Sequence, residues 1–178
     1  RGPSGAGARR LFAKLVEELA PPLVLHVAGV PGGLEPLGSL RLALLHQFGS
    51  EAAVHAAFTT LDDAARGRLT KLVRGEVLPF DDGVLLVRAM LARSASRPGK
   101  SVVLLDPVGG IDPSTLKLLN DVVDHPGAEA ALVVRLPEEG RVPAGIAASG
   151  VTEFSLPRLT PPLARSLDSM VLGEPEGS

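Results

Sequence analysis

A glycine-rich turn is the part of this chain whose residue types could bind phosphate. An apolar run at 23–28 leads into the turn at 29–39, and a helical pattern of leucine and alanine begins there. Gly33 and Gly38 have the spacing of a phosphate-binding loop, in which backbone N–H groups and the start of a helix hold the anion. Ser39 follows Gly38 directly, where that loop has a lysine. The turn has the outline of a phosphate site but lacks the cation that grips the phosphates.

Three residues inside the turn oppose an anion. Pro31 and Pro36 have no backbone N–H to donate, and Glu35 places a carboxylate where the phosphates would lie. Arg41, one turn into the following helix, is a cation that could replace the missing lysine. The residues favour a turn between a strand and a helix that holds no ligand, and nucleotide binding is the alternative.

A second stretch, at 104–119, places an acid at the end of an apolar strand. Asp106 follows the apolar run 101–105 directly. An acid in this position can hold the magnesium ion of a bound nucleotide. The plain alternative is that Asp106 caps a helix or binds the neighbouring loop.

The pattern of this stretch resembles the AAA-type core of STAND signalling ATPases, whose equivalent stretch is similar to D-D-x-x-W-A-D-P-x-S-L-x-L-L. Asp106 matches the first acid, and Asp112 and Pro113 fall at the same offset. Pro107 stands at the second acid, which in such families helps to activate the attacking water, and Gly110 replaces the aromatic residue. Proline can neither accept a proton nor orient a water. Pro113 is followed by Ser114, Leu116, Leu118 and Leu119, and the three leucines stand at leucine positions of the pattern.

The resemblance covers most of residues 23–170 in order and spacing. The run 131–135 looks like the family's sensor strand, which ends in an arginine, here Arg135. The run 156–161 is similar to the segment that leads into a helical lid. The resemblance implies a P-loop NTPase-like fold whose nucleotide site has decayed.

From these residues we expect a non-catalytic domain, a pseudo-ATPase, that acts as a regulatory or protein-interaction module of a larger protein and uses no cofactor. The alternative is a weakly hydrolysing ATPase that binds ATP and holds magnesium through Asp106. We assign no catalytic residue. The residues that would contact a nucleotide, if one binds, are Gly33, Gly38, Ser39, Arg41, Asp106 and Arg135.

The composition limits the class of protein and its partners. The chain has 178 residues, 45% of them hydrophobic, which is enough for one buried core. It has no cysteine, only five aromatic residues and a net charge of −2, so we expect no disulfide, no thiolate metal site and no nucleic-acid partner. No apolar run approaches the ~20 residues that span a bilayer. We expect a cytoplasmic protein, and a first residue other than Met suggests part of a longer one.

The apolar periodicity predicts an α/β fold: a three-layer α/β/α sandwich with a mostly parallel sheet. The run 102–105 is apolar at every position, which predicts a central strand buried on both faces. Residues 51–60 fit a strand or a short helix. We expect a flexible segment at 1–8, one domain at 9–173 and a polar tail at 174–178. Helices are expected at 11–19, 39–48, 61–73, 83–95 and 113–123, and strands at 23–28, 101–106, 130–136 and 151–156.

If the nucleotide site has decayed, the loops at the carboxyl edge of the sheet are the expected place for a protein partner. The alternative is that these loops pack on one another and close the former pocket. Homo-oligomerisation through the helix at 11–19 is a further possibility. The predicted contact surface consists of Val30, Leu34, Leu37, Val108, Ile111 and Arg141, with Arg135 beside them.

Overall fold

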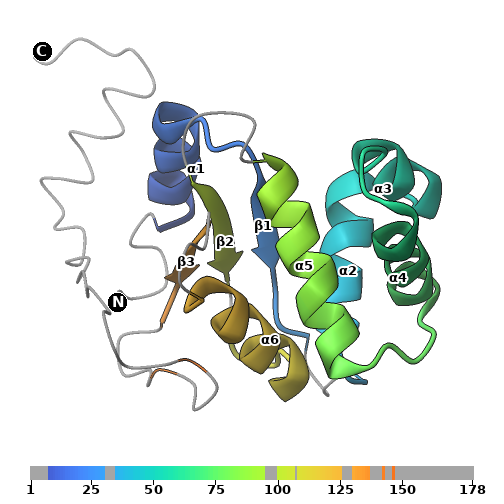
Figure 1. Ribbon diagram of the computed structural model, residues 1–178. Coiled ribbons are helices and arrows are strands. Elements are labelled where there is room, and N and C mark those ends of the chain that lie inside the picture. Colours follow the sequence, from blue (N-terminus) through green and yellow to red (C-terminus); the bar gives the residue numbers. More distant parts are fainter. Residues whose placement is uncertain are drawn as a thin grey trace, which may run out of the picture.

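The structure is a computed structural model that describes residues 8–30, 35–94, 100–106, 108–125, 130–136, 142 and 146 (Figure 1). Helices separate the strands, and four helices in succession lie between the first strand and the second. In chain order the elements are α1 (Ala8–Leu19), β1 (Val24–Val27), α2 (Gly38–Phe48), α3 (Glu51–Ala57), α4 (Asp63–Arg74), α5 (Phe80–Ser94), β2 (Ser101–Leu105), α6 (Pro113–Val123) and β3 (Ala130–Val134).

The described strands form a three-stranded parallel sheet in the order β1-β2-β3. Val24 of β1 pairs with Val102, and Ser101 of β2 pairs with Ala130. The predicted α/β class with a parallel sheet is therefore confirmed, and β2 is the central strand of the three. The expected strand at 151–156 and the expected tail at 174–178 lie outside the described residues, as do residues 1–7 of the segment expected at 1–8. The last residue of that segment, Ala8, begins α1.

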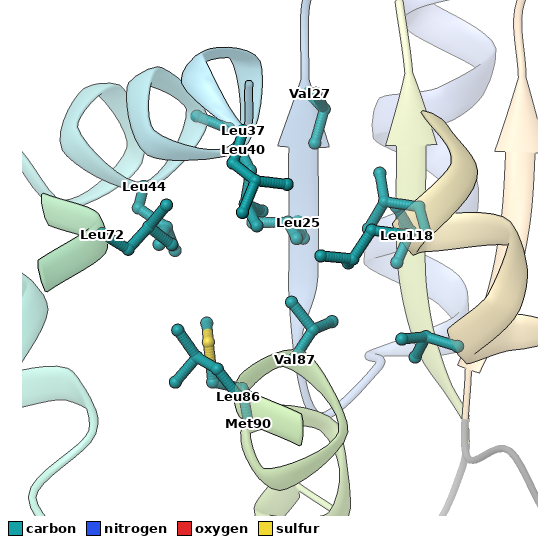
Figure 2. Close-up of a cluster of buried hydrophobic side chains, with 14 of the residues drawn as sticks. Leu25, Val27, Leu37, Leu40, Leu44, Leu72, Leu86, Val87, Met90 and Leu118 are labelled. Carbon is teal, nitrogen blue, oxygen red and sulfur yellow. The ribbon is translucent and has the colours of Figure 1, made fainter. Parts of the chain in front are cut away.

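The main core lies between one face of the sheet and helices α2, α4, α5 and α6. Leu25 and Val27 of β1 and Val103 and Leu105 of β2 point into it and are fully buried. Figure 2 shows leucine side chains of the helices meeting this face of β1. The helical members of this cluster include Leu40, Leu44, Leu72, Leu86, Val87, Met90 and Leu118.

Local signals explain where the helices begin. Ser50 accepts a hydrogen bond from Ala53 N–H, and Asp62 accepts one from Ala65 N–H, so each side chain caps the helix that follows. The Ser50 cap makes 51–57 a helix, which resolves the ambiguity of that stretch. α6 begins with Pro113 at its first position, where a missing N–H costs nothing.

α1 lies against the other face of the sheet. Phe12 and Val16 are half-buried. With Leu15 and Leu19 they line an apolar groove against three strand residues, Val102, Leu104 and Val133. In Figure 1, α1 stands beside the strands on the side away from α3 and α4. Among the described helices, none is both long enough and apolar enough to cross a membrane.

Candidate functional site

The carboxylate of Asp112 lies at the start of two helices. It caps α6, because Oδ1 accepts a hydrogen bond from Thr115 N–H at 2.8 Å and Oδ2 accepts one from the Thr115 hydroxyl at 2.7 Å. The same two oxygens face α2: Oδ1 accepts from Leu37 N–H at 3.0 Å, and Oδ2 accepts from Ser39 N–H at 2.9 Å. One carboxylate therefore satisfies backbone donors at both helix ends.

Ser39 completes the link from the side of α2. Its hydroxyl oxygen accepts a hydrogen bond from Asp112 N–H at 3.0 Å, and both residues are buried. Leu37, which precedes α2, has a left-handed backbone with φ of 63°, and this turns its N–H toward the same carboxylate. The link ties the glycine turn to the segment after β2, 73 residues away along the chain.

The surroundings of Asp112 keep it ionised. Burial of the carboxyl group acts to raise its pKa, and the hydrogen bonds from Thr115 and Ser39 act to lower it. The hydrogen bonds prevail, so the pKa of Asp112 lies below its ordinary value of 3.8. A full negative charge therefore sits at the N-terminus of α2 at neutral pH, where the helix dipole favours an anion.

Asp106 and Arg135 form a second polar pair at this edge of the sheet. Asp106 is almost fully buried, and its Oδ1 accepts a hydrogen bond from Arg135 Nε. The ring Nε2 of His26 lies 3.1 Å from the carbonyl oxygen of Asp106. The side chain predicted as a magnesium ligand is thus paired with the arginine predicted as the sensor. The described residues include no group of three or more His, Cys, Asp or Glu side chains that could hold a metal ion.

The two loops at the carboxyl edge of the sheet contact each other through their backbones. Val30 N–H donates to the carbonyl oxygen of Gly110 at 3.3 Å. A Cβ atom at Gly29 would overlap the carbonyl group of Gly109, and Gly110 has a φ of 83°. Glycine is required at these positions because no side chain fits between the loops. The described parts of these two loops therefore contact each other directly.

The guanidinium of Arg41 binds the end of α4. Its Nε donates to the carbonyl oxygen of Val73 at 2.9 Å, in the last turn of α4, where carbonyl groups lack helical partners. The side chain also lies over Gly75, just past the end of α4, and lines a small cavity with Glu35 and Glu76. The proposed substitute for the lysine therefore caps a different helix.

The remaining predicted site residues have different outcomes. Gly38 and Ser39 lie at the start of α2 beside Asp112, and Gly33 lies outside the described residues. Of the predicted contact surface, Val30 is half-buried, and Leu34 and Arg141 are not described. The rest of that surface consists of Leu37, Val108 and Ile111, and the expectation that they are exposed is wrong. Their side chains pack into the main core and are 3%, 9% and 6% exposed.

Sequence reasoning missed the second role of Asp112. Its place before Pro113 predicts a helix cap, and the cap is present. No spacing in the sequence indicates that the same carboxylate reaches the backbone of Leu37 and Ser39. Comparisons of the chain with protein-family models, with curated proteins and with solved structures found no match. The functional inference accordingly rests on the geometry of these residues.

Proposed function

We propose that this chain is a P-loop NTPase-like domain of three-layer α/β/α architecture that neither binds nor hydrolyses nucleotide. It serves as a cytoplasmic regulatory or protein-interaction module of a larger protein, with another protein or another domain as its partner. The observation that carries the proposal is the Asp112 carboxylate at the N-terminus of α2. An anion of the chain itself takes the hydrogen bonds that a P-loop-like turn would give to a phosphate.

Competition between this carboxylate and a phosphate group supports the absence of binding. A phosphate that takes Leu37 N–H and Ser39 N–H must displace Asp112 and then lie near its charge. Each hydrogen bond to a charged acceptor contributes about 1.5–3 kcal/mol, and about 1.4 kcal/mol is a tenfold change in affinity. Losing two such bonds weakens phosphate binding by about a hundredfold or more.

The absence of hydrolysis is supported by the residues around Asp106. Hydrolysis needs a group that orients or deprotonates the attacking water, and Pro107 in the neighbouring position has no such group. Asp106 itself holds Arg135, so magnesium would have to displace a charged partner from a buried carboxylate. Arg41, the remaining candidate cation, is bound to the end of α4.

Calorimetric titration of the chain with ATP and magnesium tests the proposal. We expect binding no tighter than millimolar, because the turn has no lysine and its donors are already bonded. Micromolar binding would overturn the proposal. If micromolar ATP binding were lost in Asp106→Asn and kept in Asp62→Asn, the protein would instead be a weakly hydrolysing ATPase that holds magnesium through Asp106. Asp62 is a suitable control because it is an exposed cap of α4, with no bond to the glycine turn.

A further inference from the structure

An exposed apolar stripe runs along α1. Leu11, Leu15 and Leu19 recur at every fourth position, which places them on one face of the helix. Their exposed fractions are 42%, 40% and 63%, and they make up half of the exposed large apolar side chains among the described residues. Leu15 and Leu19 also border the apolar groove that Phe12 and Val16 form with the sheet, so two of the three stripe residues lie at the edge of that groove. A stripe of this kind in solvent is typical of a surface that another helix covers.

The charges of α1 divide between its two halves. Arg10 and Lys14 lie in the N-terminal half, and Glu17 and Glu18 lie in the C-terminal half. All four residues are exposed, so their side chains are free to reorient. Lys14 contacts Glu17 at 3.1 Å within the helix, an exposed pair of the kind that contributes little to stability. The basic half of one helix is therefore complementary to the acidic half of another helix that runs in the opposite direction.

We propose that the partner of this stripe is α1 of a second copy of the chain, packed antiparallel about a two-fold axis at Leu15. In that arrangement Leu15 meets its own copy, and Leu11 meets Leu19 of the second molecule. Arg10 and Lys14 then lie beside the acidic half of the other helix, and the reciprocal contacts follow by symmetry. The centre of the apolar stripe and the point where the charge changes sign coincide, as an antiparallel pair requires.

The size of the interface sets the expected affinity. α1 has 12 residues and a length of about 18 Å, so the pair forms a small interface. Interfaces of this size are typical of weak, reversible association. The proposal rests on α1 alone and is independent of whether the chain binds nucleotide.

Sedimentation velocity over a wide range of concentration tests the dimer. We expect a monomer–dimer equilibrium that Leu15→Glu weakens at least about tenfold, because two carboxylates then meet at the axis. Leu85→Glu is the matched control, since Leu85 is an exposed leucine on α5, away from this stripe. A chain that stays monomeric at every concentration would overturn the proposal, and so would a dimer that Leu15→Glu leaves intact.

Charge reversal provides a second test that does not alter the apolar stripe. We expect the acidic variant Arg10→Glu with Lys14→Glu, and the basic variant Glu17→Lys with Glu18→Lys, each to lose self-association. An equimolar mixture of the two should regain it as a heterodimer, because opposite charges again face each other. A mixture that stays monomeric would exclude the antiparallel pairing. If wild type is monomeric and Leu15→Glu lowers its melting temperature, the stripe is covered by the same chain and the proposal fails.

Discussion

Replacing Asp112 with asparagine tests the link between α2 and α6 directly. The carboxylate accepts four hydrogen bonds, and an asparagine of the same shape keeps one acceptor oxygen. That oxygen can keep the bonds from Leu37 N–H and Thr115 N–H. The amide NH2 group of asparagine then faces Ser39 N–H, and two donors cannot bond to each other. The Thr115 hydroxyl can rotate to accept, so the variant leaves one buried backbone N–H unpaired.

The expected cost follows from this count. A buried donor without a partner costs about 1–3 kcal/mol, so we expect Asp112→Asn to lose about 2 kcal/mol of unfolding free energy. Asp112→Ala loses the cap of α6 and both bonds to α2, and we expect a loss of about 4 kcal/mol. Urea unfolding at neutral pH measures both values. Asp62→Asn is the control: asparagine caps a helix as well as aspartate does, so its cost should be only a few tenths of a kcal/mol.

The pH dependence gives a second readout. The pKa of Asp112 is lower in the folded protein than its ordinary value of 3.8, so its ionised form stabilises the fold. This stabilisation is fully present above about pH 4–5 and is lost as the pH falls through the lowered folded-state pKa. The difference between wild type and Asp112→Asn should therefore be constant near neutral pH and shrink in acid. A cost below about 0.5 kcal/mol, or a difference that persists in strong acid, would refute the proposed network.

Two further substitutions test the contacts around this site. Gly29→Ala should lower the unfolding free energy by about 2 kcal/mol or more, because its methyl group would overlap the backbone of Gly109. The control is Gly109→Ala, whose methyl group meets no atom within 4 Å, so it should be nearly neutral in the same urea titration. Arg135→Ala should lower the unfolding free energy by about 3 kcal/mol, because it leaves the buried Asp106 carboxylate without its charged partner. An unchanged melting temperature would show that this pair does not stabilise the fold.

The sequence by itself determined the elements whose signals are local. The uninterrupted apolar run in β2 predicts a central strand, and β2 pairs on both sides. Asp112 and Pro113 predict the start of α6 because capping depends on neighbours within one turn. The stretch 51–57 stayed ambiguous, since alternating small apolar residues fit a strand as well as a helix. The Ser50 cap and packing around the buried Val54 favour the helix.

Only the tertiary structure decided what the glycine turn does. The Leu37 and Ser39 donors are backbone N–H groups, which every residue except proline carries. The residue types at these positions therefore do not indicate that Asp112 binds them. Burial of Val108 and Ile111 likewise depends on how the loop after β2 packs against the turn after β1, and loop residues carry no periodicity that reveals a buried face. Contacts between residues far apart in the chain follow from the packing of the sheet and helices, and that packing brought a carboxylate to the start of α2.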